Sequence, residues 1–282
     1  MVGDAAQAIY GWRGAIDVLS TTSVDHRTRL SRSFRFGQAV ADEANVWLAR
    51  IGTSLRITGD PARASTLEVI DNPDAVLCRT NGRAVQEVMT AHTGGIAVSL
   101  VGGGRDIRSL AEAAQRLQAG QSSGHPELIA FPTWQSVRDY AEHDPTGSDL
   151  AVAVKLIDTY GADEVIAAVD ACVTEDRAQL VVSTAHKAKG REWDRVRIAT
   201  DFRAPKIDKN TGERAPIPKE EAMLAYVAVT RAKQVLDNDG LAWIHDDEYA
   251  TAAPEPHPTP PPPHPTPGPV SDCAAQAAAI QL

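Results

Sequence analysis

Several features that define common classes of protein are scarce in this sequence. Three cysteines in 282 residues lie far apart and form no C-x-x-C pair, so neither a disulfide framework nor a zinc cluster is indicated. No apolar run approaches the roughly 18 residues that a membrane-spanning helix requires. Residues 1–25 lack the charged and then apolar layout of a signal peptide. These absences favour a protein of the reducing cytoplasm, with no membrane partner.

Basic charge is also scarce. Lys and Arg total 28 against 37 Asp and Glu, which gives a formal net charge of −9. A chain with this balance carries no general positive field, so any contact with nucleic acid must be a local patch or a stacking surface. The apolar content of 43% and the charged content of 23% are ordinary for a globular protein.

Proline is concentrated near the C-terminal end of the chain. Ten of the sixteen residues in 254–269 are proline. Proline fixes φ and has no amide donor, so this stretch favours an extended polyproline helix and cannot join a core. We expect residues 251–282 to form a disordered Pro- and Ala-rich tail. The alternative is a ligand for a polyproline-binding partner with an aromatic-lined groove.

Elsewhere, short apolar runs alternate with segments of helical periodicity, which indicates an α/β fold with a parallel sheet. Strands are expected at residues 67–70, 75–78, 97–101, 180–183, 196–200 and 233–236. Helices are expected at 38–50, 83–91 and 220–230. The pattern from 104 to 171 is helical, and we interpret that block as an insertion into one α/β domain.

Four strings in a fixed order carry chemical information. They are VGDAAQAIYGWRGA at 2–15, LSRSFRF at 30–36, VSTAHKAKGREW at 182–193 and EEAMLAYVAVTRAK at 220–233. In that order they resemble motifs III, IV, V and VI of the UvrD/Rep-like DNA helicases of superfamily one. The string VLCRTN at 76–81 resembles a strand end of the same family. The resemblance therefore covers residues 2–233, and it is nearest to the F-box-type DNA helicase branch and its bacterial or phage relatives.

The sequence departs from the family pattern at several points. Ser33 replaces the usual Asn, Phe36 the usual Ser, and Met223 the usual Arg. No Walker A sequence, G-x-x-x-x-G-K-[ST], occurs in the chain, and the glycine run at 102–104 lacks its lysine. The pair Asp42-Glu43 resembles a Walker B box, but it lies in an expected amphipathic helix, where we interpret it as a solvated face.

The resemblance implies three catalytic residues. Arg35 and Arg231 match the arginines that reach the γ-phosphate across a domain interface, and an arginine finger accelerates hydrolysis by about 10³–10⁵. Gln7 matches the glutamine that senses the γ-phosphate. The expected helix over 220–230 is strongly amphipathic and is closed by Arg231, so an ordinary helix-end arginine is the alternative.

The same resemblance implies the contacts of ATP. Phe34 matches the aromatic residue that covers the adenine, and a core position is its alternative. Gly190 and Glu192 belong to the motif whose carboxylate holds the ribose hydroxyl. The implied cofactor is ATP with Mg²⁺, and the family's magnesium ligands precede motif III. No metal ligand is therefore expected among these residues.

Two further groups are expected to contact single-stranded DNA. An aromatic slot binds unpaired bases without sequence preference. The resemblance assigns this role to Tyr10, Trp12 and Arg13, with hydrophobic packing as the alternative. A hydroxyl, an imidazole and an ammonium group after a strand can meet backbone phosphates. Those side chains are Thr184, His186 and Lys187, with a structural histidine as the alternative.

Family members pair two RecA-like domains around ATP and move along single-stranded DNA, usually 3′ to 5′. The resemblance implies that residues 1–25 end the first domain, that 27–103 with 172–250 form the second, and that 104–171 are a short insertion. We therefore expect the C-terminal motor half of an ATP-dependent DNA helicase, inactive until a P-loop domain joins it in cis or in trans. A fragment, a split subunit and a non-catalytic DNA- or protein-binding remnant remain open.

Overall fold

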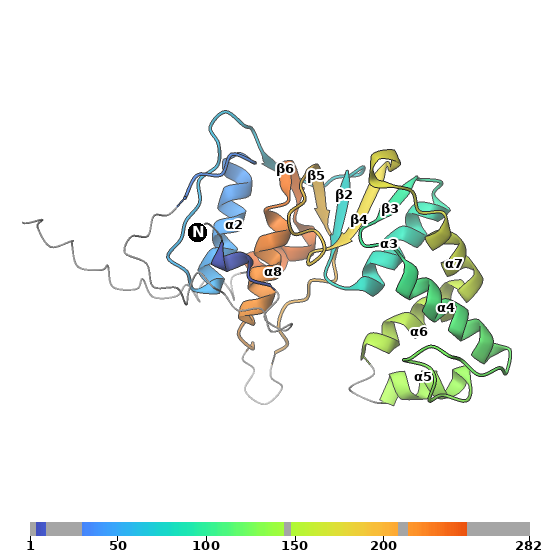
Figure 1. Ribbon diagram of the computed structural model, residues 1–282. Coiled ribbons are helices and arrows are strands. Elements are labelled where there is room, and N and C mark those ends of the chain that lie inside the picture. Colours follow the sequence, from blue (N-terminus) through green and yellow to red (C-terminus); the bar gives the residue numbers. More distant parts are fainter. Residues whose placement is uncertain (1–3, 10–29, 144–147, 208–213, 247–282) are drawn as a thin grey trace, which may run out of the picture.

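The computed structural model describes residues 4–9, 30–143, 148–207 and 214–246. In that part of the chain, six strands form one sheet in the order β1-β6-β5-β2-β4-β3, and every strand pair is parallel (Figure 1). The strands are β1 Thr66–Leu67, β2 Ala75–Cys78, β3 Val98–Leu100, β4 Leu180–Thr184, β5 Trp193–Ile198 and β6 Ala232–Asp237. Each lies at or beside an expected strand, so the predicted α/β fold is confirmed.

Helices cover both faces of this sheet (Figure 1). They are α2 Gln38–Ile51, α3 Asn81–Thr93, α4 Arg105–Gln118, α5 Trp134–His143, α6 Ser148–Tyr160, α7 Ala162–Asp170 and α8 Lys219–Val229. Short 3₁₀ helices are η1 Ala5–Gln7, η4 Glu175–Arg177 and η5 Asp239–His245. Helices α2 and α8 pack on one face, while α3 and the helices α4 to α7 lie on the other.

The central strands are buried on both sides. All four residues of β2 and all five of β4 are buried. Along β2, Ala75 and Leu77 enter the core beneath α2 and α8, while Val76 and Cys78 enter the core beneath α3. This alternation has the period of two that a strand imposes, and it explains why β2 and β4 read as continuous apolar runs.

The block between β3 and β4 is helical, as its sequence pattern predicts. It contains α4 to α7, of which the periodicity located only the cores of α4 and α6. The insertion packs on the sheet domain through one shared core. At Gly82, the second residue of α3, an added Cβ would lie 1.7 Å from Val152 Cγ1 of α6. Glycine therefore permits the close approach of these two helices.

The expectation of an amphipathic helix closed by Arg231 is wrong. Helix α8 ends at Val229, and every residue from Ala222 to Val229 is buried. The helix is enclosed because α2, η1 and the sheet all pack against it. A helix buried all round shows no polar stripe. Arg231 follows the helix and is itself 1% exposed.

A second correction concerns the acidic pair in α2. Asp42 is exposed, but Glu43 is only 3% exposed and does not lie on a solvated face. Its carboxylate accepts a hydrogen bond of 3.3 Å from Trp47 Nε1 and lies 2.8 Å from His245 Nε2. Buried carboxylates require such partners, and this one attaches η5 to α2.

Candidate functional site

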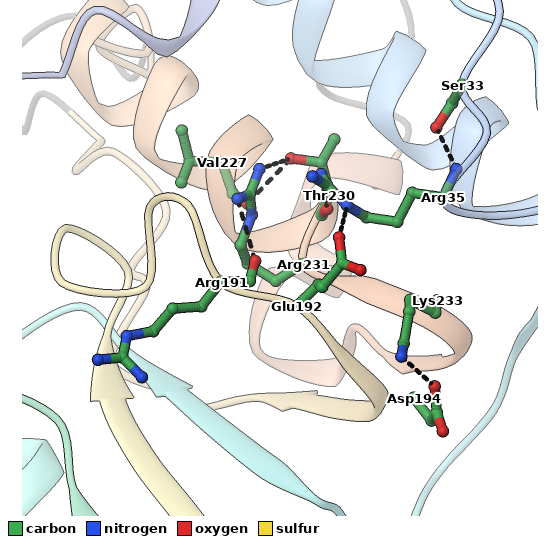
Figure 2. Close-up of polar contacts among 9 residues, drawn as sticks. All are labelled: Ser33, Arg35, Arg191, Glu192, Asp194, Val227, Thr230, Arg231 and Lys233. Carbon is green, nitrogen blue, oxygen red and sulfur yellow. Dashed lines mark hydrogen bonds and ion pairs between the residues drawn. The ribbon is translucent and has the colours of Figure 1, made fainter. Parts of the chain in front are cut away.

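Three predicted site residues meet at the amino ends of β5 and β6. Glu192 directly precedes β5, and Arg231 directly precedes β6. The amide of Trp193 donates a 3.0 Å hydrogen bond to the carbonyl of Arg231, which aligns the two strand entrances. Arg35 reaches the same place from the segment before α2 (Figure 2). The structure thus gathers side chains that are separated by up to 196 positions in the sequence.

Arg35 is held by two acceptors on different segments. Its Nε lies 2.5 Å from Glu192 Oε2, and its Nη1 donates to the carbonyl of Thr230 at 3.0 Å. The Arg35 amide donates to Ser33 Oγ at 3.2 Å, so the residue that replaces the family asparagine orders this turn. The side chains of Arg35 and Glu192 remain 31% and 46% exposed. Both charged groups are therefore open to a ligand.

The charge of Arg35 acts on the neighbouring carboxylate. Its hydrogen bond is the largest influence on Glu192 and lowers the pKa of that carboxyl group; partial burial opposes this, and the charges of Arg35, Lys233 and Arg231 add to the lowering. Lys233 itself pairs with Asp194 at 2.7 Å beside the cluster (Figure 2). Glu192 is thus an ionised acceptor over the physiological pH range.

Arg231 is bound within the protein. Its Nε donates to the carbonyl of Val227 at 2.9 Å, its Nη1 to the carbonyl of Arg191 at 3.2 Å, and its Nη2 to Thr230 Oγ1 at 2.9 Å. Burial, followed by the charge of Arg35, lowers the pKa of Arg231 to about 10. In this structure Arg231 orders Thr230, whose carbonyl in turn holds Arg35. The predicted finger role of Arg231 requires it to exchange these acceptors.

Gln7 lies on η1, which packs against α8. Its side-chain amide donates to Asp4 Oδ2 at 2.8 Å, and the hydroxyl of Tyr226 donates to the same oxygen at 3.1 Å. Burial raises the pKa of the Tyr226 phenol, and the charge of Asp4 adds to that shift. Lys189 Nζ donates to the carbonyl of Gln7 at 2.8 Å. These bonds join η1 to α8 and to the segment 185–192.

Phe34 is on the surface. Its side chain is 68% exposed, so the core alternative is wrong. The guanidinium carbon of Arg32 lies 5.1 Å from the ring centroid, a cation–π arrangement. Arg32 also pairs with Asp60 at 2.8 Å, and that bond is the largest cause of a lowered pKa of Asp60. An exposed ring beside Arg35 is available to stack on a base.

The residues of the string at 182–193 that are predicted to contact DNA lie at the end of β4 and just after it. Thr184 is buried, and its Oγ1 accepts a 3.4 Å hydrogen bond from the amide of Lys187. His186 is half-buried and Lys187 is exposed. Lys187 extends over Gly102, where an added Cβ would lie 3.1 Å from its Nζ. Of these three side chains, Lys187 presents its charge most openly at the carboxyl edge of the sheet.

A groove of about 980 Å³ opens at the carboxyl ends of β2 and β5. The charged residues that line it are Arg79, Arg83, Lys155, Asp201, Arg203 and Glu221. Sequence reasoning assigned none of them. Arg79 lies in the string VLCRTN at 76–81, which resembles a strand end of the family, and the carboxyl ends of parallel strands are where α/β sheets bind ligands. That rule could have found Arg79, but not Lys155, which comes from the insertion.

The groove adjoins the Thr184 turn. Cys78 is in register with Thr184, and the amide of Ala185 donates to the carbonyl of Cys78 at 2.9 Å. Arg79 and Ala185 therefore leave the sheet side by side. From there, residues 185–192 return to the amino end of β5 in eight positions. This crossover joins the two edges of the sheet directly.

Gly190 lies near the end of the crossover. Its φ is +86°, a left-handed conformation, and no atom would lie within 4 Å of an added Cβ. The conformation, and not a lack of space, therefore requires glycine. It turns the chain so that Arg191 and Glu192 arrive at the amino edge. The structure shows nothing of a nucleotide contact at Gly190, which stays a prediction.

Some predicted features lie elsewhere. Tyr10, Trp12 and Arg13 lie outside the described residues, as does the tail at 251–282. In the described ranges, no group of three or more His, Cys, Asp or Glu side chains is arranged to hold a metal ion. None of the helices in those ranges has the length and apolar character to cross a membrane.

The covered parallel sheet and the helical insertion define a RecA-like α/β domain. Residues 158–237 match the UvrD-like helicase C-terminal domain family. The chain is 30% identical over 268 residues to F-box DNA helicase protein 1 of Schizosaccharomyces pombe. The matched region covers 84% of this chain and 30% of that protein. The chain is also 25% identical over 265 residues to F-box DNA helicase 1 of Gallus gallus. That match covers 84% of this chain and 26% of the Gallus gallus protein. The chain spans less than a third of these relatives' length, and it matches the C-terminal part of a UvrD-like helicase.

Proposed function

We propose that this chain supplies the second RecA-like domain of an ATP-dependent DNA helicase. The observation that carries the proposal is the crossover at 185–192. It connects Glu192, paired with Arg35 at one edge of the sheet, to Thr184 and Lys187 at the opposite edge. A change at the nucleotide can reach the DNA contacts through eight residues. The names of the similar proteins, both DNA helicases, support the same assignment.

The amino edge is suited to ATP. Arg35 offers a partly exposed guanidinium for the γ-phosphate, Glu192 a carboxylate for the ribose hydroxyls, and Phe34 an open ring for adenine. Bound ATP with Mg²⁺ would supply the phosphoanhydride whose hydrolysis drives movement. Positive charge on the developing phosphate oxygens is the main catalytic need of phosphoryl transfer. The pairing of Arg35 with Glu192 keeps both groups ordered until phosphate and sugar take their places.

The second partner in this proposal is a P-loop domain, in cis or in trans. We place the Walker A loop and the magnesium ligands there, with residues 1–25 as the end of that domain. The hydrogen bonds from Tyr226 to Asp4 and from Lys189 to the carbonyl of Gln7 then become contacts across the domain interface. Gln7 lies where it would report a change at the γ-phosphate to α8.

Single-stranded DNA is the proposed substrate of the carboxyl edge. Lys187 and His186 would contact its phosphates, with Thr184 fixing their turn. Tyr10, Trp12 and Arg13 would supply the stacking contacts, and the tail a site for a polyproline-binding partner. Phosphate contacts position a strand without reading its sequence, as a translocating motor requires.

An unwinding assay on the native protein from its source cells tests the proposal. We expect ATP-dependent unwinding of a duplex with a 3′ single-stranded tail and far less with a 5′ tail. The same preparation, analysed by intact mass, shows whether the P-loop domain is in the same polypeptide. Binding of single strands without any ATP hydrolysis would contradict the motor role and favour a non-catalytic remnant of a helicase.

A further inference from the structure

The groove at the carboxyl edge is built by two parts of the protein. One wall is α6 of the insertion, which contributes Ala151, Val152 and Lys155. A second part of the lining is the segment that follows β5, including Arg203 and Pro205. Arg79 and Thr80, at the end of β2, are also among the lining residues. A ligand in this groove would therefore touch the sheet domain and the insertion at once.

Most charges in the groove are already engaged. Arg79 donates to the two carboxylate oxygens of Glu221 at 2.8 and 2.5 Å. Asp201 accepts from the amides of Arg79 and Thr80 at 2.9 and 2.8 Å, and from the Thr80 hydroxyl at 2.9 Å. Arg83 pairs with Glu87 at 2.6 Å. These bonds order the base of the groove, where Glu221 is paired with a cation and Asp201 is held by neutral donors.

Two cations in the groove differ from the rest. Lys155 and Arg203 are exposed, come from these two separate parts of the lining, and form no ion pair within the part of the chain that the structure describes. A Lys and an Arg that face one groove without acidic partners are suited to an anionic chain that passes between them. Because the whole protein has an excess of acidic residues, two such cations in one groove stand out as a candidate site for an anion.

The wall formed by α6 is fixed in place. Val152 packs so closely on Gly82 of α3 that no other residue fits there without movement. Arg138 of α5 binds Asp158 of α6 at 2.8 and 2.7 Å, and Trp134 Nε1 donates to the same carboxylate at 2.8 Å. Lys155 therefore projects from a helix that is anchored on both sides.

We propose that Lys155 of the insertion and Arg203 of the sheet domain hold the phosphates of single-stranded DNA in this groove, so that the insertion forms one wall of the strand-binding site. The inference rests on the proposed function. It extends the DNA contacts from Thr184 and Lys187 past Arg79 into the groove, along neighbouring strand ends. The insertion then handles the strand itself, in addition to any effect on duplex DNA.

Binding of a labelled oligo(dT) to the 282-residue chain, measured by fluorescence anisotropy at several salt concentrations, tests this inference. The variants are Lys155→Glu, Lys155→Gln and Arg203→Glu. Arg116→Glu on α4 is the matched control, because Arg116 is exposed, lies outside the groove and has the same charge change. We expect each Glu variant to bind about tenfold more weakly, and each to lower the salt slope by roughly 0.7 per lost phosphate contact.

The outcomes separate the two proposals. In one outcome the wild-type chain binds DNA, while Lys155→Glu and Arg203→Glu weaken that binding no more than Arg116→Glu does. This result would overturn the role of the groove and leave the helicase proposal intact. No binding by the wild-type chain would overturn the groove and the DNA contacts of the proposed function together. Lys155→Gln keeps the helix and removes only the charge, so an effect on DNA binding with unchanged circular dichroism cannot be attributed to unfolding.

Discussion

Arg35 and Glu192 form an ion pair at the amino edge of the sheet, and its place at the proposed ATP site matters more than its contribution to stability. Both side chains are more than a quarter exposed, and ion pairs of this kind contribute about 0–1 kcal/mol to stability. The pair therefore contributes little to the stability of the fold, and a ligand can replace either partner at low cost. A phosphate that competes for Arg35 and a sugar hydroxyl that competes for Glu192 lose little by separating them.

The first prediction concerns the titration of Glu192. Arg35 lowers the pKa of this carboxyl group in the folded protein. The folded-state pKa lies below the unfolded one, so the stabilisation is present above the ordinary Glu pKa and is lost as the pH falls through the folded value. We expect Arg35→Ala to raise the pKa of Glu192 towards its ordinary value, as measured by carboxyl ¹³C chemical shifts. Arg63→Ala, an exposed arginine of the same region, should leave it unchanged, and equal pKa values in all three proteins would contradict the pairing.

Resemblance predicted individual residues unevenly. It assigned Arg35 and Glu192 separate contacts with ATP, because both lie within short motifs, and the structure adds that the two side chains are paired. It did not reveal that Arg231 is buried, since its three acceptors come from α8 and from the crossover, 40 positions away in the chain. The exposure of Phe34 also depends on how the segment at 30–36 leaves the core, which no local pattern specifies.

Helix α8 and its end form one buried hydrogen-bonded unit. The hydroxyl of Thr230 donates back into the last turn, to the carbonyls of Tyr226 and Val227 at 2.9 and 3.1 Å. The same hydroxyl accepts from Arg231. Helix ends require partners for their last carbonyl groups. Here the side chains of Thr230 and Arg231 provide them.

The second prediction follows from this unit. Arg231→Ala removes a buried side chain and its three hydrogen bonds, and a bond from a charged donor contributes roughly 1.5–3 kcal/mol. The carbonyl of Val227 keeps the Thr230 hydroxyl as a donor, so the loss is smaller than the sum of the three. We expect the free energy of unfolding to fall by roughly 2–4 kcal/mol in urea denaturation. Arg231→Lys should recover only part of the loss, because one ammonium group cannot replace the three-way geometry. The exposed control Arg116→Ala should stay within about 0.5 kcal/mol of the wild type.

A stability change below about 0.5 kcal/mol in Arg231→Ala would contradict the structural role and favour a side chain that is free for the γ-phosphate. The comparison matters for any kinetic study, because a loss of hydrolysis in this variant has two possible origins. Arg35→Ala has no such ambiguity, since Arg35 is partly exposed.

Periodicity located most elements but not all of their limits. The fully buried β2 and β4 were found because apolar runs bounded by turns are a strong signal. Strand β5 begins at Trp193, three positions before its predicted start, because the charged and partly buried Asp194 and Arg195 interrupt the apolar run. Helix α5 was missed because it buries only Trp134 and Val137. Helix α7 was missed because it has only nine residues and follows a glycine with φ of +85°.

Taken as a whole, the molecule places two kinds of chemistry at opposite edges of one sheet. The amino edge holds a partly exposed arginine, a carboxylate and an aromatic ring. The carboxyl edge holds Lys187 and a groove with unpaired cations among the described residues. A parallel sheet makes this separation possible, since each crossover must travel from one edge to the other. The crossover at 185–192 does so without a helix, so the two edges are linked by a short segment.

The arrangement in space was only partly open to prediction. The domain assignment at 104–171 gave the position of the insertion in the chain, but not that its α6 would border the groove. That contact depends on Gly82 and Val152, which are 70 positions apart and belong to no motif. The local basic patch that an acidic protein requires was expected in general terms, whereas its residues became visible only in the fold.

ATP hydrolysis by the native protein, with and without single-stranded DNA, tests the central claim most directly. The comparison is between the wild type, Arg35→Ala and the control Arg63→Ala. We predict that DNA stimulates hydrolysis in the wild type and the control, and that Arg35→Ala lowers the rate about 10³-fold, the lower end of an arginine-finger effect. A rate for Arg35→Ala within about threefold of the wild type, or roughly 0.7 kcal/mol, would contradict the assignment of this edge to the γ-phosphate of ATP.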